Sequence, residues 1–252
     1  DASGAEDGDR ATSDGLFVSW KRDAQPKVRR GEKLSVTGRV VELGGRAPTL
    51  TALVDARIEV LGRAAVQATT LSRAPARASD WEALEGMWLR LPGPLVISGN
   101  ANLTRFGELH VAFGERLRAP TDIASPGAKA QAVEEENRRR GLIIDDARGS
   151  EYPNRLWFLD PPLSNENTLR AGSLVHGVEG VLDARHGSWR LQLTEKLGRI
   201  ESAPRPAMPV LPQGLRLVSY NLGNLFNGNG RGGGFPTERG ASSLQEYQRQ
   251  RD

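Results

Sequence analysis

Short stretches in which apolar and polar residues alternate, separated by Gly, Pro and Asn, run through most of residues 15–201. Successive side chains of a β-strand point to opposite faces of the sheet, so a period of two predicts strands. We expect strands within residues 15–20, 33–43, 48–53, 57–62, 86–98, 107–117, 141–146, 173–184 and 188–195. So many short strands with turn signals between them restrict the chain to a mainly β fold.

Residues 125–142 break the strand pattern and predict one inserted helix. Ser125 is expected to cap its start and Gly141 to follow its last turn. Three consecutive Glu at 134–136 each precede an Arg at 138–140 by four residues, the order that favours exposed ion pairs. These arginines are candidates for phosphate contacts, but we favour a self-neutralised, solvent-exposed face and treat the helix as scaffold.

A weak internal repeat connects residues 15–53 with residues 141–193. Each part has an apolar strand, a spacer, an Arg-Gly or Arg-x-Gly turn, a long strand with an interior Gly, and a short strand. An interior Gly lets a long strand bend or form a bulge, and bent strands turn the corners of small oligonucleotide-binding (OB) barrels. Residues 15–201 are therefore predicted to form an OB-like β-barrel, either elaborated or duplicated.

The chain outside this region divides into three further parts. Residues 1–14 start with Asp rather than Met and are small and acidic, which predicts a disordered leader that lacks its initiator or signal peptide. Residues 202–214 hold four prolines within nine positions, which predicts a stiff linker. Residues 215–252 are expected to begin a second domain with one strand and one helix, and Ser243 and Glu246 have capping-box spacing. No stop signal ends that helix, which we interpret as truncation.

Composition restricts the chemistry of residues 15–201. The absence of Cys and the presence of three His argue against a structural zinc site, and no Ser/His/Asp arrangement or convincing carboxylate pair is found. The net charge of +3 permits nucleic-acid binding without requiring it, since a GC-rich genome also explains the preference for Arg over Lys. No apolar run is long enough to span a membrane. This region is predicted to be a binding or supporting module that needs no cofactor of its own.

Aromatic residues beside basic residues are the candidates for contacts with DNA, because bases stack on exposed rings next to Arg. They are Trp20, Phe106 with Arg105, and Trp189 with Arg190. The alternative for each aromatic ring, which we favour for any one taken singly, is a place in the core. Asp145 and Asp146 close a predicted strand, where turn residues are the favoured interpretation and metal ligands the alternative.

The segment "LRLVSYNLGNLFN" after the linker resembles the first strand of the endonuclease/exonuclease/phosphatase superfamily, which has the DNase I-like α/β fold. Further blocks resemble, in order, large secreted bacterial nucleases that place a barrel domain before a DNase I-like catalytic domain. These blocks are "DGLFV", "LEGMWLRLPGPLVISGNANLTRFGEL", "ENRRRGLIIDD", "LRAGSLVHGVEGVLDARHGSWRLQ" and "GGFPTERGASSLQEYQRQRD". The resemblance covers nearly the whole chain from Asp14.

This resemblance implies a secreted, extracellular or periplasmic enzyme that hydrolyses phosphodiester bonds of extracellular DNA with Mg²⁺, or with Mn²⁺ or Ca²⁺. The family's first strand ends in an Asn that helps to hold the metal–phosphate centre, and Asn221 matches it. The family's other metal ligands and catalytic residues have no match in these 252 residues, so this chain alone is expected to be inactive. The alternative is a stand-alone OB-type module that binds nucleic acid or another polyanion without catalysis.

Overall fold

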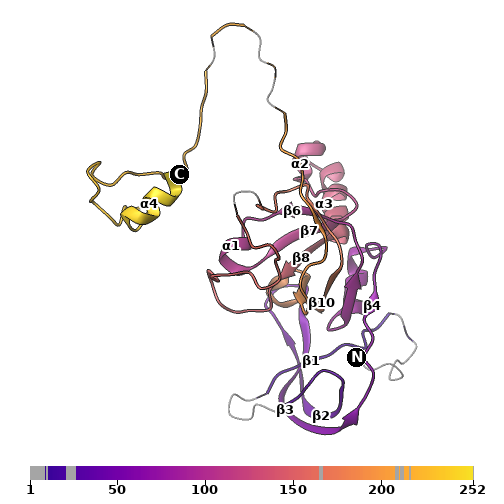
Figure 1. The fold of residues 1–252 in the computed structure, drawn as a ribbon. Coiled ribbons are helices and arrows are strands. Elements are labelled where there is room, and N and C mark those ends of the chain that lie inside the picture. Colours follow the sequence, from indigo (N-terminus) through magenta and orange to yellow (C-terminus); the bar gives the residue numbers. More distant parts are fainter. Residues whose placement is uncertain are drawn as a thin grey trace. The chain divides into compact units, whose positions relative to one another are not determined.

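The computed structural model describes residues 9, 11–20, 27–164, 167–207, 210, 213–215 and 217–251 (Figure 1). It divides into two compact units, Asp1–Arg205 and Pro206–Asp252. The boundary between these units lies inside the proline-rich segment. The first unit is mainly β, and its curled, mixed sheets form a half-barrel with few helices.

The larger sheet has nine strands in the order β12-β9-β6-β7-β8-β11-β10-β5-β4. Two of its pairs, β8 with β11 and β4 with β5, are parallel, and the others are antiparallel. The strands are β4 (Thr69–Thr70), β5 (Trp88–Leu91), β6 (Leu95–Gly99), β7 (Leu109–Phe113), β8 (Gly141–Asp145), β9 (Leu174–Val175), β10 (Val178–Asp183), β11 (Arg190–Leu193) and β12 (Ile200–Glu201).

One chain segment, which contains β5 and β6, contributes strands at two separated positions of this sheet. β5 and β6 follow each other in the chain with only residues 92–94 between them. In the sheet, however, β5 pairs with β10 and β6 pairs with β7, and the strands β8 and β11 lie between those two pairs. The sheet must curl to bring these two separated positions back to one chain segment, which explains the half-barrel.

The core lies on the inner face of this curl. Alternate residues of the central strands are buried there, including Leu109 and Val111 of β7, Ile144 of β8 and Leu191 of β11, each 0% exposed. Trp81, on the 3-10 helix η1 (Ala78–Leu84), is also 0% exposed, and its Nε1 donates to the carbonyl of Arg139 at 3.1 Å. The period of two therefore marks the residues that face this core, although β6, β7 and β11 also bury consecutive residues.

A second sheet has three strands, β1 (Phe17–Val18), β2 (Glu32–Leu43) and β3 (Leu50–Arg63), in the order β1-β3-β2. The strands expected at 48–53 and 57–62 are one continuous strand, because β2 is long enough to pair with β3 from Glu32 to Leu43. The two expected strands are joined at a register shift, where the pairs Arg39–Val54 and Thr37–Arg57 leave two residues of β3 opposite one residue of β2.

The internal repeat corresponds to a repeated pairing pattern. β1 is parallel to β3, which is antiparallel to β2; likewise β8 is parallel to β11, which is antiparallel to β10. Of the interior glycines, Gly38 lies at the expected bulge, whereas the ladders through Gly180 have no register shift and glycine is needed there for close approach. The ladder shifts register at Gly38, where a Cβ would lie 2.9 Å from the carbonyl oxygen of Val54, and a Cβ on Gly180 would lie 2.4 Å from that of Gln192.

The predicted inserted helix is α3 (Ala128–Arg140), which contacts β7, β8 and η1 (Figure 1). Its start is not where we expected, since Gly127 is the N-cap residue and no side chain caps it. Gly141 does follow the last turn, in an extended conformation. A side chain there is excluded because its Cβ would lie 2.8 Å from the carbonyl oxygen of Asn137.

The charged face of α3 is partly as predicted. Glu134 pairs with Arg138 at 3.5 Å and Glu136 with Arg140 at 3.1 Å, both four residues apart. Arg139 pairs with Glu136 instead of Glu135, at 2.6 Å. Arg139 also donates to the carbonyl of Pro75, and Arg140 to those of Phe113 and Glu115, at 2.8–2.9 Å. The arginines therefore attach the helix to neighbouring segments, which supports a scaffold role.

The other helices of the first unit are short: α1 (Leu103–Phe106), α2 (Pro120–Ile123) and η2 (Arg185–Gly187). None of the helices that the structure describes is long and apolar enough to cross a membrane.

In the second unit the predicted helix is α4 (Leu244–Arg251), and its start has one half of the expected capping box, the bond to Ser243 Oγ. The backbone N–H of Glu246 donates to Ser243 Oγ at 3.1 Å, while the Glu246 carboxylate accepts from the N–H of Ser242 at 2.8 Å. The strand expected after the linker is not formed, and that prediction is wrong. Residues 217–222 have no regular secondary structure, and Leu217 is 89% exposed, because no described residue of this unit offers a strand to pair with.

Candidate nucleic-acid interface

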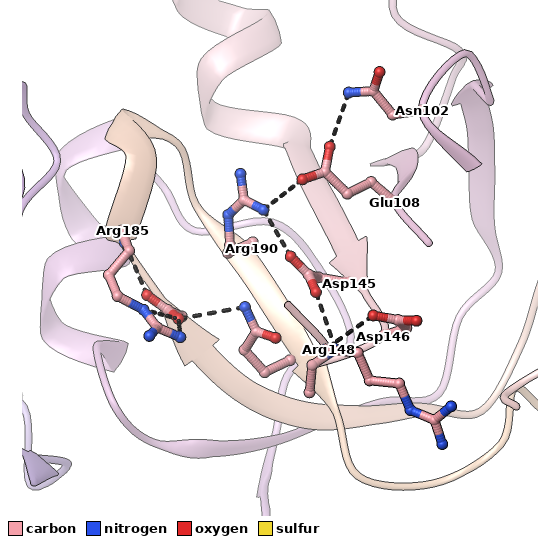
Figure 2. Close-up of polar contacts among 10 residues, drawn as sticks. Asn102, Glu108, Asp145, Asp146, Arg148, Arg185 and Arg190 are labelled. Atoms are coloured by element: carbon pink, nitrogen blue, oxygen red, sulfur yellow. Dashed lines mark hydrogen bonds and ion pairs between the residues drawn. The ribbon is translucent and has the colours of Figure 1, made fainter. Parts of the chain in front are cut away.

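A buried network of charges lies where β7, β8 and β11 meet (Figure 2). At its centre is Arg190, whose side chain is 8% exposed. Its Nη1 donates to Glu108 Oε1 at 2.7 Å and to Asp145 Oδ2 at 2.6 Å. The sequence placed Arg190 among the candidates for DNA contacts, whereas the structure places it inside the protein, between two carboxylates.

Strand register explains why these residues meet. Leu109 of β7 is opposite Ile144 of β8, so Glu108 precedes β7 beside Asp145. Ile143 of β8 is opposite Arg190 of β11 in the parallel ladder. Because neighbouring residues of a strand face opposite sides, these charged side chains share the face away from the apolar core.

The opposite charges of this network stabilise one another. Burial raises the pKa of Glu108, but hydrogen bonds from Arg190 and Asn102 outweigh burial and lower it. Burial lowers the pKa of Arg190, and the hydrogen bonds to Glu108 and Asp145 reverse this and raise it. Both groups are therefore charged at neutral pH. Nearby His110 has a pKa lowered mainly by burial, which favours its neutral form.

Asp145 and Asp146 act as turn residues at the end of β8. Asp145 Oδ1 accepts from the N–H of Ala147 at 3.0 Å, and Asp146 Oδ1 from that of Arg148 at 2.9 Å. Asp146 is 1% exposed, and burial is the main cause of its raised pKa. A Cβ on Gly107 would lie 2.6 Å from Asp146 Cγ, so glycine is required at the end of α1 for this carboxylate to fit.

An exposed surface lies on the two loops that the network braces, and we call it the Arg105 surface: Arg105, Phe106, Glu151 and Tyr152. The Arg105 guanidinium carbon is 4.6 Å from the centroid of the Phe106 ring and 5.8 Å from that of Tyr152. Arg105 also forms a two-point ion pair with Glu151, at 3.1 Å from Nε and 3.3 Å from Nη2. Tyr152 is 66% exposed.

The buried network fixes the loops that carry this surface. Asn102 Nδ2, at the start of α1, donates to Glu108 Oε2 at 2.8 Å (Figure 2). On the other loop, Trp157 Nε1 donates to the carbonyl of Asp146 at 2.9 Å. The N–H of Tyr152 donates to the carbonyl of Arg105 at 2.7 Å and joins the two loops directly. The sequence did not indicate Glu151 or Tyr152, because this contact joins residues 46 positions apart in the chain.

The remaining sequence candidates lie elsewhere. Trp20 is 37% exposed, and its basic neighbours Lys21 and Arg22 lie outside the described residues. Trp189 is partly buried and packs against the core. Asn221 is exposed, and its Oδ1 accepts from the N–H of Gly223 at 2.9 Å in a local turn. The structure therefore brings together only Arg105 and Phe106 from the predicted set.

The fold and this surface define a mainly β half-barrel domain with a buried charge network beneath a loop surface that carries aromatic rings and an exposed Arg–Glu pair. The chain belongs to the family described as "Domain of unknown function (DUF8508)", which matches residues 53–202, more than half of the chain. That range contains all strands of the nine-stranded sheet and both loops of the Arg105 surface. No curated protein and no solved structure matched the chain.

Proposed function

We propose that this chain is the DNA-binding part of a secreted, metal-dependent nuclease, and that its barrel region, residues 15–201, holds the DNA. The observation that carries the proposal is the order of the strands along the curled sheet between β6 and β5. If β5 and β6 are taken as one bent strand, this strand with β7, β8, β10 and β11 gives five strands in a ring. An OB-fold is a five-stranded, partly open barrel of this kind.

The positions of the loops support the same function. OB-folds bind oligonucleotides with the loops that follow the first and fourth strands. Counted from the bent strand β5–β6, these loops are residues 100–108 and 184–189. The first loop holds Arg105 and Phe106, and the second ends at Trp189. Guanidinium groups bind phosphate and rings stack on bases, and the first loop presents the exposed Arg105 beside the half-buried ring of Phe106.

The nuclease part of the proposal depends on the resemblance to the DNase I-like fold, with Asn221 as the matching residue. The described residues do not fit a Mg²⁺ centre. The Asn221 amide oxygen is used in a turn, and no group of three or more His, Cys, Asp or Glu among them is arranged to hold a metal ion. The other ligands for Mg²⁺, Mn²⁺ or Ca²⁺ would have to be supplied by residues other than the described ones.

A salt titration of oligonucleotide binding tests the proposal. With a fluorescein-labelled single-stranded oligonucleotide, log K should fall linearly with log salt, by about 0.7 per phosphate neutralised. Trp20→Ala and Trp189→Ala identify whether those rings take part. Absence of binding at low salt would contradict a DNA-binding barrel and leave it as a supporting domain.

The second candidate is a stand-alone binding module without catalysis. The ring of strands and the Arg105 surface lie wholly within the unit Asp1–Arg205, which favours a module that needs nothing from the second unit. Incubation of the full chain with Mg²⁺ and plasmid DNA is expected to give no cleavage under either proposal. Mg²⁺-dependent cleavage that is lost in Asn221→Ala would show that this chain is itself a nuclease.

A further inference from the structure

We propose that the Arg105 surface is a site for a single-stranded polynucleotide, in which a backbone phosphate replaces Glu151 on Arg105 while a base stacks on Tyr152. This inference rests on the proposed DNA-binding function, and it assigns that function to four residues. The geometry of Arg105 is its starting point.

The Arg105 guanidinium already holds an anionic group in the way that a phosphate would be held. Its Nε and Nη2 contact the two carboxylate oxygens of Glu151 at 3.1 and 3.3 Å. Two parallel N–H donors fit two oxygens of a phosphate as well as those of a carboxylate. Both side chains of the pair are 50% exposed, so a ligand can reach the guanidinium from solvent.

The rings beside Arg105 distinguish a polynucleotide from other polyanions. Tyr152 is 66% exposed, and the Arg105 guanidinium lies near both its ring and that of Phe106. A base offers a flat face to such a ring, and loss of one stacking ring weakens binding by about 5- to 150-fold. Bases in a duplex are stacked on each other, so only a single strand can offer this face.

Glu151 then sets how tightly the site binds. Because the phosphate must displace it, the ion pair with Arg105 opposes binding. Loss of an exposed ion pair of this kind changes an equilibrium constant by about 1.4- to 5-fold. Glu151→Gln should therefore tighten binding by about that factor, while Arg105→Gln should weaken it.

The test measures the affinity of the full chain for labelled oligo-dT by fluorescence anisotropy. Tyr152→Ala should weaken binding by at least about fivefold, and Tyr152→Phe should restore it because the ring is kept. Glu135→Gln is the matched control, since it removes an exposed ion pair to Arg138 of 3.2 Å on α3, away from these rings. Its affinity should equal that of the wild type.

The outcomes separate this inference from the proposed function. No binding by the wild type would overturn the proposed function itself. Binding that is unchanged in Arg105→Gln and Tyr152→Ala would overturn this site and leave DNA binding elsewhere on the barrel. Equal binding of inorganic polyphosphate, insensitive to Tyr152→Ala, would show a general polyanion site without base stacking. Tighter binding in Glu135→Gln as well as Glu151→Gln would show that only net charge matters.

Discussion

Two parts of the first unit share one pairing pattern but have different surroundings. In the later part, β8-β11-β10 is paired on both sides, with β7 and with β5, and Leu191 is 0% exposed. In the earlier part, β1-β3-β2 pairs with no further strand among the described residues, and Val60 is 50% exposed. The same local sequence pattern thus builds the same three strands, while neighbouring strands decide how much of them is buried.

The two parts also differ in the pair of residues at one equivalent position of the ladder. Where each long strand turns into the next strand, the earlier part pairs Leu43 with Leu50, and the later part pairs Asp183 with Arg190. Leu50 is 1% exposed and Arg190 7% exposed, so both are buried. A buried Leu needs only apolar neighbours, whereas a buried Arg needs acceptors. The later copy supplies these acceptors through Glu108 and Asp145 and so acquires the network beneath the Arg105 surface.

Arg190→Met should give the largest loss of stability. It leaves Glu108 and Asp145 as buried carboxylates without their cation, and breaking a buried ion pair in this way costs about 3–5 kcal/mol. Urea unfolding of the full chain measures the loss. Addition of Glu108→Gln and Asp145→Asn to Arg190→Met should recover part of it, since these changes remove the unpaired charges. A loss below about 1 kcal/mol would show that the network is not needed for folding.

A matched pair of isoleucines tests the difference in burial. Ile144 of β8 is 0% exposed, and Ile144→Ala should cost about 2–5 kcal/mol of unfolding free energy. Ile58 of β3 is only half-buried, so Ile58→Ala should cost about 1 kcal/mol. Equal losses in urea unfolding would mean that the earlier sheet is as fully packed as the later one.

The two interior glycines provide a smaller test. In Gly180→Ala the new Cβ would lie 2.4 Å from the carbonyl oxygen of Gln192 and 2.8 Å from Leu191 Cγ, inside a sheet paired on both sides. We expect a cost of about 1–3 kcal/mol. In Gly38→Ala the closest atom is 2.9 Å away, and β2 is an edge strand that can move. Thermal unfolding should therefore rank Gly180→Ala as the less stable variant.

Much of the fold could be predicted from local sequence because its causes are local. The period of two marked the strands, and the repeat at Gly38 and Gly180 marked the shared pairing pattern. The start of α3 was misplaced because Ser125 has the right type for a cap, although the helix begins only after Gly127. The strand after the linker was not formed, since β-pairing depends on a partner that an apolar segment does not specify.

The candidate site was less predictable because its contacts are not local. Arg190 follows Trp189, which suggested an exposed aromatic–basic pair. Its partners Asp145 and Glu108 are 45 and 82 positions away in the chain. The register of β11 against β8 decides whether Trp189 or Arg190 faces these partners. No sequence pattern gives that register.

The smallest effect we predict concerns the contact between β3 and Glu85, the residue that ends η1. Glu85 is 5% exposed, and its Oε1 accepts from the N–H of Thr51 in β3 at 2.7 Å. Burial is the main cause of its raised pKa, and the charges of Glu82 and Glu42 add to it. The stability that this carboxyl contributes is therefore full below its unfolded value of 4.5 and is lost as pH rises through the higher folded value.

Urea unfolding between about pH 4 and pH 8 should show this loss in the wild type. Glu85→Gln keeps an acceptor for the N–H of Thr51 but cannot ionise, so its unfolding free energy should decline less over the same range. Glu59→Gln is the matched control, because Glu59 is an exposed carboxyl of β3, the strand that contains Thr51. This variant should keep the wild-type dependence of unfolding free energy on pH. If both variants decline as the wild type does, ionisation of Glu85 does not weaken the contact between the earlier sheet and the rest of the unit.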